Sequence, residues 1–399
     1  MDALTTPLNW QRVRLGDIAE IKRGASPRPI ENPKWFCANS NVGWVRISDI
    51  SKNSRFLYKT AQKLSKKGIE KSRLVKQNSL IMSMCATIGK PIITKIDTCI
   101  HDGFVVFENP KIDLNYLYYF LCYIEKEWLE SGQQGSQVNL NVDLIKNKEV
   151  FYPKDLNEQI AIANILSDVD HYLYTLDALI LKKESVKKAL SFELLSQRKR
   201  LKGFNQAWEK IRLGDICEFG NGGAYETLIV ENGNFKLISL NSIDIDGNLK
   251  NTMKRVNFYD NSLKQDDIVM VLSDVAHGDF LGLCAVIPSN DYVLNQRMGR
   301  LRKRNDCINI LFLRLYINAN QKYFKMQGQG SSQLNLSKKA IEDFEILLPP
   351  LNEQTAIANI LSGLDHEIIS LKNKKRQFEN IKKALNHDLM NAKIRVLKK

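Results

Sequence analysis

Two glycine-containing loops hold side chains well suited to hydrogen-bond a nucleic acid. Residues 132–139 read GQQGSQVN and residues 327–335 read QGQGSSQLN, so similar polar tracts occur twice in the chain. Such tracts pack poorly in a core, but amide and hydroxyl groups bond readily to base edges and phosphates. A second pair of loops, residues 22–28 and 220–225, contains glycines that would let the backbone approach a phosphate closely. For each loop, the alternative is an ordinary turn that binds nothing.

A third pair of loops and several basic side chains add further candidates. Residues 83–90 and 273–278 each follow an expected strand and end at or near a glycine. Trp44, beside Arg46, can either contact the DNA backbone or lie in the core. In residues 1–153, the first module, the candidate DNA contacts are Lys22, Arg23, Ser26, Arg28, Arg46, Lys63, Lys67, Ser83, Thr87, Lys90, Gln133, Ser136, Gln137 and Asn139. In residues 203–350, the second module, they are Asn221, Tyr225, Ser239, Asn241, Ser273, His277, Gln296, Arg297, Gln329, Ser331, Ser332 and Gln333.

The chain lacks the usual sequence signals of a catalytic or metal site. Its 7 cysteines form no CxxC pair and its 5 histidines have no metal-ligand spacing, so we expect reduced thiols and no bound metal. His101 precedes Asp102, but no nucleophile accompanies them in the sequence. There is no Walker A sequence, no Asn-Pro-Pro-Tyr-like tetrapeptide and no glycine-rich loop in a βαβ unit. We therefore expect the chain to be non-catalytic and to bind no cofactor.

Short strands and helices are predicted to position these loops. Helical periodicity is seen over residues 114–129 and 308–326. Branched and aromatic runs bounded by turn residues predict strands at 43–47, 80–83, 91–94, 104–107, 235–238, 268–272 and 284–287. Both modules are therefore expected to be α+β.

The chain also contains an internal duplication. Residues 156–167 and 351–362 agree at 11 of 12 positions and lie 195 residues apart. Trp10 with Leu-Gly-Asp-Ile at 15–18 recurs as Trp208 with the same tetrapeptide. A duplication of this size predicts two similar modules with pseudo-two-fold symmetry, which would suit duplex DNA. The net charge of +14 weakly favours the same partner.

Each duplicated segment is predicted to begin a long helix. Pro153 or Pro350 precedes it, and Asn157 or Asn352 is the expected N-cap. About 40 residues at 1.5 Å each would span about 60 Å. Apolar residues at helical spacing predict that the two helices pair as an antiparallel coiled coil, the alternative being that each packs on its own module. The expected pairing residues are Leu166, Val169, Leu173, Leu176, Ile180, Leu361, Leu364, Ile368, Leu371 and Phe378.

These patterns divide the chain into four parts. We expect a first recognition module at 1–153, a first spacer helix at 154–202, a second module at 203–350 and a second spacer helix at 351–399. No apolar run approaches the ~20 residues of a membrane span, and no signal peptide is recognisable. We therefore expect the protein to be cytoplasmic.

The arrangement resembles a known family over essentially the whole chain. The order of module, helix, module and helix is similar to that of the specificity (S) subunit of type I restriction-modification systems. So are the Trp and Leu-Gly-Asp-Ile opening of each half and the Leu-Asn-Glu-Gln entry to each helix, at residues 156–159 and 351–354.

This resemblance implies a DNA-binding role within a larger complex. Each target recognition domain would read one half of a bipartite, asymmetric site in double-stranded DNA, and the helices would set the unread gap. Two methyltransferase (M) subunits and the restriction (R) subunits would dock on the chain. S-adenosylmethionine would be bound by the methyltransferase, and ATP and Mg by the restriction subunit. The resemblance supplies no base-reading residues. Two alternatives are a coiled-coil protein scaffold without sequence-specific DNA binding and a nuclease with an unrecognised site.

Overall fold

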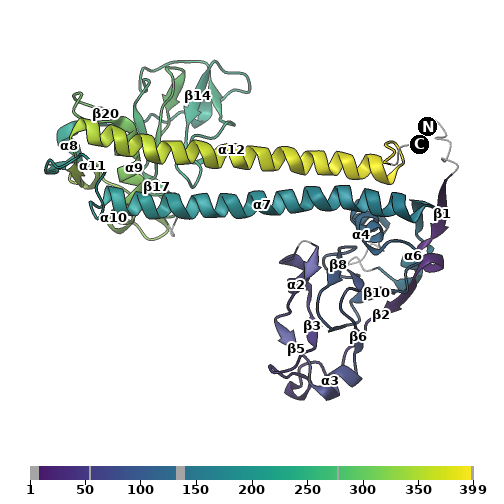
Figure 1. The fold of residues 1–399 in the computed structure, drawn as a ribbon. Helices are drawn as coiled ribbons and strands as arrows, with labels where there is room; N and C mark the ends of the chain where they lie inside the picture. The colour runs from purple at the N-terminus through teal and green to yellow at the C-terminus, as the bar shows by residue number, and fades with distance from the viewer. Residues whose placement is uncertain (1–8, 54, 132–139, 276–277, 397–399) are drawn as a thin grey trace. The chain divides into compact units, whose positions relative to one another are not determined.

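The chain folds into two compact units, each with its own module. The computed structural model describes residues 9–53, 55–131, 140–275 and 278–396. Unit 1 comprises residues 1–177 with 374–399, and unit 2 comprises residues 178–373. The long helices α7 (Leu156–Leu195) and α12 (Leu351–Met390) each contribute to both units (Figure 1). Among the described helices, none is both long and apolar enough to cross a bilayer.

The module of unit 1 contains three sheets. A two-stranded antiparallel sheet joins β1 (Trp10–Arg14) to β11 (Glu149–Pro153). The five-stranded sheet has the order β2 (Glu20–Arg23), β10 (Phe104–Glu108), β7 (Leu80–Ser83), β8 (Pro91–Thr94), β4 (Phe56–Leu57). The four-stranded sheet has the order β5 (Gln62–Lys63), β3 (Gly43–Val45), β9 (Thr98–Ile100), β6 (Arg73–Val75). The helices are α1 (Leu15–Ile18), η1 (Pro33–Trp35), α2 (Ile47–Ser51), α3 (Lys66–Glu70), α4 (Leu114–Tyr123), α5 (Glu125–Ser131) and α6 (Val142–Asn147).

The central strands of this module are apolar because both of their faces are covered. Successive strand side chains point to opposite faces of a sheet. Leu80 and Met82 of β7 therefore join the core that includes α4, whereas Ile81 joins a second core. That second core also contains Val45 of β3 and Ile100 of β9. The continuous apolar runs seen in the sequence are thus explained by strands buried on both sides.

The module of unit 2 repeats the scheme. Its strand pairs are β12 (Glu209–Arg212) with β22 (Glu345–Leu348), and β17 (Ser273–Val275) with β21 (Gln333–Asn335). Its four-stranded sheet has the order β13 (Cys217–Asn221), β20 (Met298–Lys303), β16 (Ile268–Val271), β18 (Cys284–Val286). Its three-stranded sheet has the order β15 (Arg255–Val256), β14 (Phe235–Ile238), β19 (Tyr292–Leu294). Its helices are α8 (Leu213–Ile216), η2 (Glu226–Leu228), η3 (Leu240–Ser242), α9 (Ile310–Ala319), α10 (Gln321–Gln327) and α11 (Lys338–Glu342). The expectation of two α+β modules is confirmed.

Two details of the helices differ from the sequence prediction. The helix expected over 114–129 is broken at Ile124, and its counterpart is broken at Asn320. The expected N-caps were wrong, because Asn157 and Asn352 lie inside the first turns of α7 and α12. The carboxylate of Asp155 instead accepts the backbone N–H of Asn157.

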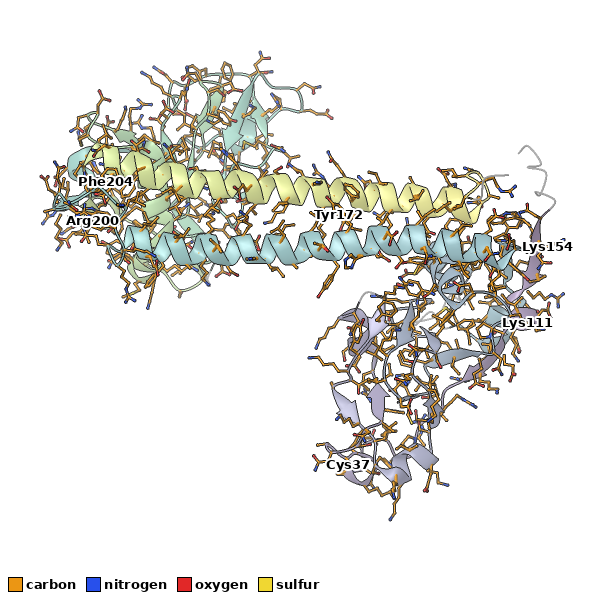
Figure 2. All side chains as sticks on the ribbon, in the orientation of Figure 1. Cys37, Lys111, Lys154, Tyr172, Arg200 and Phe204 are labelled. Carbon is orange, nitrogen blue, oxygen red and sulfur yellow. The ribbon has the colours of Figure 1, made fainter. Side chains whose placement is uncertain are left out.

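Within each unit, α7 and α12 run antiparallel and pair through side chains. In unit 1, Lys382 contacts Asp170 at 2.5 Å and Lys375 contacts Asp177 at 2.6 Å. The ring of Tyr172, which is labelled in Figure 2, lies 4.5 Å from that of Phe378. As the number rises along α7, it falls along α12, so the predicted antiparallel pairing is confirmed.

The same pairing holds in unit 2. It also gives a role to lysines that lie within or beside the apolar stripe of the two long helices. Lys183 contacts Glu367 at 2.5 Å, and Lys187 pairs with Asp365. Their alkyl stems extend the stripe while their ammonium groups reach carboxylates on the facing helix. Four stripe lysines, Lys183, Lys187, Lys375 and Lys382, are therefore interhelical ion-pair residues.

The repeated Leu-Asn-Glu-Gln motif has a structural role that the sequence did not reveal. The Glu158 carboxylate is 1% exposed and accepts from the Trp10 indole N–H at 3.3 Å and from Arg395 at 3.1 Å. In unit 2, Glu353 accepts in the same way from Trp208 at 3.0 Å and from Arg200 at 2.6 Å. Each glutamate thus joins three segments: the start of a module, the start of the long helix to which the glutamate belongs, and the segment that follows the other long helix.

The adjacent glutamines join each long helix to its module. The Gln159 Oε1 atom accepts the backbone N–H of Asp113 at 2.7 Å, and its Nε2 donates to the Pro153 carbonyl at 2.8 Å. Gln354 accepts from the backbone N–H of Asn309 and donates to the Pro349 carbonyl, both at 2.8 Å. Asp113 and Asn309 are the N-caps of α4 and α9, so the motif fixes the same helix in both modules.

Candidate nucleic-acid interface

In unit 1, the glycine-containing loop after β2 lies against the turn that follows β9. The Gly24 N–H donates to the Phe104 carbonyl at 2.8 Å, and the Ala25 N–H donates to the Ile100 carbonyl at 3.0 Å. A Cβ on Gly24 would lie 2.1 Å from the His101 carbonyl oxygen, so only glycine allows this close approach. Residues 24–28 and 101–103 are thereby held together.

Unit 2 builds the same loop pair with the same backbone contacts. A Cβ on Gly222 would again lie 2.1 Å from a carbonyl oxygen, that of Asn295. The Gly222 N–H donates to the Met298 carbonyl at 3.3 Å, and the Gly223 N–H donates to the Leu294 carbonyl at 3.1 Å. Residues 222–226 therefore correspond to 24–28, and residues 295–297 correspond to 101–103.

The first loop pair is organised around Asp102. The Ser26 hydroxyl donates to its Oδ1 at 2.7 Å, and Arg28 Nη2 donates to its Oδ2 at 2.9 Å. Arg23 Nε donates to the Asp102 carbonyl at 2.7 Å. Burial acts to raise the pKa of Asp102, but the hydrogen bond from Ser26 and the charge of Arg28 outweigh it and the pKa is lowered. Asp102 is therefore an anion at neutral pH.

A cavity of about 480 Å³ opens beside this carboxylate. Ser26, Arg28, Trp44, Arg46 and Asp102 are among the residues that line it. Trp44 is fully buried, as the core alternative proposed, yet it also forms part of the cavity wall. Among the described residues, no acceptor lies within hydrogen-bonding distance of its indole N–H. Three of these five side chains can only donate hydrogen bonds.

His101 also lines this cavity and is not arranged as a catalytic base. Its Nδ1 accepts the backbone N–H of Gly103 at 2.9 Å, and its ring packs edge-on against Phe104 at 4.6 Å. Burial lowers the pKa of His101, the Asp102 carboxylate acts against this shift and Arg46 adds to it. The imidazole is thus a neutral structural group at pH 7.

In the second loop pair, a carboxylate takes the place of the arginine. Glu226 corresponds to Arg28, and its Oε1 accepts from the Asn295 amide at 2.9 Å. Asn295 is 3% exposed and also accepts the Tyr225 backbone N–H at 3.0 Å. A hydrogen bond from Gln296 is the main cause that lowers the pKa of Glu226. Glu226 is exposed and ionised, so this loop presents a hydrogen-bond acceptor.

The structure places the candidates of the first module in several different locations. Arg23, Ser26, Arg28 and Arg46 lie around the cavity or its neighbouring turn. Lys63 and Lys67 are exposed on β5 and α3, whereas Lys22 pairs with Glu20 and Glu108 on the β2 edge. Ser83 is buried and its hydroxyl donates to the Thr87 carbonyl, while Thr87 and Lys90 are half-buried in the loop after β7. Gln133, Ser136, Gln137 and Asn139 lie outside the described residues.

The candidates of the second module also fall into separate places. Tyr225, Gln296 and Arg297 belong to the loop pair, and exposed Asn221 ends β13 beside it. Ser239 corresponds to Arg46, because each follows the strand that runs parallel to β19 or β9, and Asn241 is exposed in η3. Ser273 is buried and donates to the Asn335 amide at 2.6 Å. Gln329, Ser331 and Ser332 lie in the tract before β21, and Gln333 is the first residue of that strand. His277 lies outside the described residues.

The helix-pairing candidates all lie on the two long helices, with different degrees of burial. Leu166, Leu176, Ile180, Leu361 and Ile368 are buried. Val169, Leu173, Leu364, Leu371 and Phe378 are half-buried.

Asp102 and Glu226 are the site residues that the candidate lists missed. Glu226 could have been found by aligning the two loops at their 198-residue offset, which places it opposite Arg28. The partnership of Arg28 with Asp102 joins residues 74 apart and has no sequence signal. Among the residues described, no group of three or more His, Cys, Asp or Glu side chains is arranged to hold a metal ion.

Comparison with known proteins finds one family over both halves of the chain. The family model for the type I restriction modification DNA specificity domain matches residues 7–183 and 205–380. The MjaVIII specificity subunit of Methanocaldococcus jannaschii is 26% identical, over 99% of this chain and 95% of that relative. The MjaX specificity subunit of the same organism, itself described as putative, is 24% identical over 98% and 95%.

Solved structures share the fold. The type I restriction-modification S subunit from M. genitalium gives a TM-score of 0.64 at 17% identity, with 97% of each chain covered. A chain from a study of complex assembly in a type I system gives a TM-score of 0.60 at 15% identity, over 98% of this chain and 99% of that one.

Proposed function

Because the chain belongs to the family of type I restriction-modification DNA specificity subunits, with two recognition domains, we propose that it reads a bipartite, asymmetric DNA target. Each module contacts one half of that target, and the paired helices set the unread gap between the halves. The chain itself does not catalyse a reaction. It directs a complex that methylates, and in the presence of restriction subunits cleaves, double-stranded DNA.

The repeated loop pair is the observation that carries this proposal. Both modules hold a glycine-containing loop against the turn after a parallel strand with matching backbone contacts. The side chains at corresponding positions differ, with Arg28 and Asp102 in one module and Glu226 and Gln296 in the other. A shared frame with different hydrogen-bonding groups suits two different half-sites, which makes the target asymmetric.

Exposed side chains around this frame supply the phosphate contacts of the proposed interface. Arg23, Lys63 and Lys67 in the first module and Arg297 in the second are exposed cations. Cations of this kind position a protein on duplex DNA and make its affinity salt-dependent. We leave Ser83 and Ser273 out of the interface because both are buried and already hydrogen-bonded.

Exposed apolar side chains on the long helices suit the docking of partner subunits. Tyr174, Leu181 and Phe192 of α7 are 72%, 64% and 56% exposed, although helix pairing buries other apolar residues nearby. Large apolar groups left on a surface commonly mark protein contacts. In the proposed complex they contact two methyltransferase subunits, which bind S-adenosylmethionine, while restriction subunits bring ATP and Mg.

The proposed roles of the four segments follow the boundaries expected from the sequence. Residues 1–153 and 203–350 are recognition modules, and residues 154–202 and 351–399 are spacers. In support, α7 begins at Leu156 and α12 begins at Leu351, each directly after the last strand of a module.

The test is to map methylated bases in a host that lacks other DNA methylation. The chain is expressed with its cognate methyltransferase subunit, and the genome is sequenced for modified bases. The expected result is a split motif of two short blocks around an unread gap, absent when this chain is omitted. If the methyltransferase is active with a different specificity subunit but gives no motif with this chain, the proposal is wrong and the scaffold alternative gains.

A further inference from the structure

The structure assigns opposite base preferences to one loop position in the two modules. Arg28 of the first module reads a guanine, and Glu226 of the second module reads a cytosine through its amino group. Asp102 and Gln296 are the positioning residues that orient them. This inference rests on the proposed function, because it names bases within the two halves of the target.

The two positions are equivalent by geometry as well as by sequence spacing. Arg28 lies four residues after Gly24, and Glu226 lies four residues after Gly222. A Cβ added to either glycine would lie 2.1 Å from the carbonyl oxygen of the residue that follows a parallel strand. The partners also correspond, since Asp102 follows His101 and Gln296 follows Asn295 at matching places in that turn.

Arg28 is held in a defined direction by a carboxylate that keeps its own hydrogen bonds. Its Nη2 lies 2.9 Å from Asp102 Oδ2, and Ser26 occupies Oδ1 at 2.7 Å. The Arg28 side chain is still 71% exposed, so the rest of its guanidinium edge is free to face a ligand. An oriented planar guanidinium loses less conformational entropy on binding than a mobile one.

The neighbouring cavity has more hydrogen-bond donors than acceptors, because both oxygens of Asp102, the carboxylate in its wall, already accept from Ser26 and Arg28. The side chains of Arg28 and Arg46 have donors and no acceptors. In the major groove, guanine presents two acceptors, O6 and N7, whereas adenine and cytosine each present a donor. Thymine presents a single acceptor, O4, beside a methyl group, so a donor-rich cavity next to an oriented arginine matches guanine best.

The second module offers the complementary chemistry. The amides of Asn295 and Gln296 donate to Glu226, which keeps the carboxylate ionised and fixes its direction. A carboxylate has about four acceptor sites, so capacity remains for a base. Cytosine presents its N4 amino group without a neighbouring acceptor, whereas the N6 amino group of adenine lies beside the N7 acceptor, which a carboxylate repels. This position therefore favours a cytosine.

The first test is the wild-type methylation motif. Both halves of the motif are expected to contain at least one G·C pair, because one half needs guanine and the other needs cytosine. A motif with a half that lacks any G·C pair would overturn the inference and leave the proposed function intact. Absence of any split motif would instead refute the proposed function.

The second test compares single variants in complex with the methyltransferase. Arg28→Ala is expected to relax one G·C position in one half, with discrimination falling on the order of 5- to 150-fold. Glu226→Ala is expected to relax one G·C position in the other half by a similar factor. The matched control, Lys67→Ala, removes an exposed cation of the first module and should lower methylation at all sites equally. An unchanged base preference in Arg28→Ala or in Glu226→Ala would contradict the inference.

If Arg28→Ala gives no modification at all, a substrate change keeps the test decisive. The wild-type complex is titrated with duplexes that contain 7-deazaguanine in place of each guanine of its target in turn. This base pairs normally but lacks the N7 acceptor. Binding should weaken about fivefold or more at one guanine of the half read by the first module. That half is identified by exchanging residues 1–153. Unchanged binding at every guanine of that half would refute the role of Arg28.

Discussion

Glu158 and Glu353 are buried charges that join separate segments within each unit. A carboxylate removed from water is tolerated only when hydrogen bonds and an opposite charge replace its hydration. Both glutamates obtain these from a tryptophan indole N–H and from an arginine that comes from the end of the other long helix. The glutamate of the repeated Leu-Asn-Glu-Gln motif therefore has the same structural role in both units.

We predict that Glu353→Ala destabilises unit 2 by about 2–3 kcal/mol. The substitution leaves the indole N–H of Trp208 and the guanidinium of Arg200 without their acceptor. For a unit of this size, the midpoint of thermal unfolding should fall by roughly 4–12 °C. Glu367→Ala, which breaks the more exposed ion pair with Lys183, is the control and should cost less than about 1 kcal/mol. Equal losses in the two variants would contradict the role given to Glu353.

His101 gives unit 1 a pH dependence whose sign follows from its environment. Burial lowers its pKa below the ordinary 6.5, so the unfolded chain binds a proton more readily than the folded one. This contribution to stability is complete above pH 6.5 and is lost as the pH falls towards the folded-state pKa. His101→Asn, which copies Asn295, removes the titrating group and should flatten this part of the profile. Thermal unfolding of both proteins from pH 7.5 to 5 tests the prediction, and parallel curves would contradict it.

Among the elements, the long helices show why charged residues can belong to a pairing stripe. Lys187 and Asp365 are 26% and 20% exposed and face each other across the helix pair of unit 2. Their partial burial strengthens the attraction relative to a fully exposed pair. The pair also favours one register, because a shift of either helix would separate the two charges.

We predict that Asp365→Lys destabilises unit 2 by about 1–2 kcal/mol, because two lysines then face each other. Adding Lys187→Asp should restore much of the loss by re-forming the pair in reverse. Thermal unfolding of the wild type, both single variants and the double variant gives the coupling energy. A coupling energy near zero would show that these charges do not stabilise the helix pair.

Elements were predictable from sequence where a single local pattern decides the structure. The strands at 80–83, 91–94 and 235–238 have the predicted bounds, since apolar runs end there at turn residues. The break at Ile124 was missed because residues 114–129 contain no Gly or Pro that would mark the end of a helix. The contacts of Glu158 and Asp102 were missed because their partners lie 237 and 74 residues away in the chain.

At the scale of the whole molecule, each module has a core of its own. The buried clusters built from strands of unit 1 contain no strand residue of unit 2, and the reverse also holds among the described residues. A module can therefore change its loops without disturbing the folding of the other.

We predict that replacing residues 1–153 with the corresponding module of another family member changes only one half of the methylated motif. The exchanged segment should retain the tryptophan equivalent to Trp10, because its indole N–H bonds to Glu158. Methylome mapping of the hybrid complex gives both halves in one experiment. A change in both halves would contradict independent reading by the two modules.

The unread gap should depend on the length of the helix pair. An insertion near the end of α7, at residues 190–200, would disturb unit 2. Leu194 and Leu195 are buried in its core, and Arg200 donates to Glu353. One heptad inserted after Asp177 and another after Asn373, where the two units divide, would preserve the pairing stripe. Seven residues add about 10 Å of helix, which is roughly three base pairs of DNA. We predict a longer gap, by up to about three base pairs, with both half-sites unchanged in the methylome. A variant that forms the complex and methylates the original gap would show that the helices do not set the spacing.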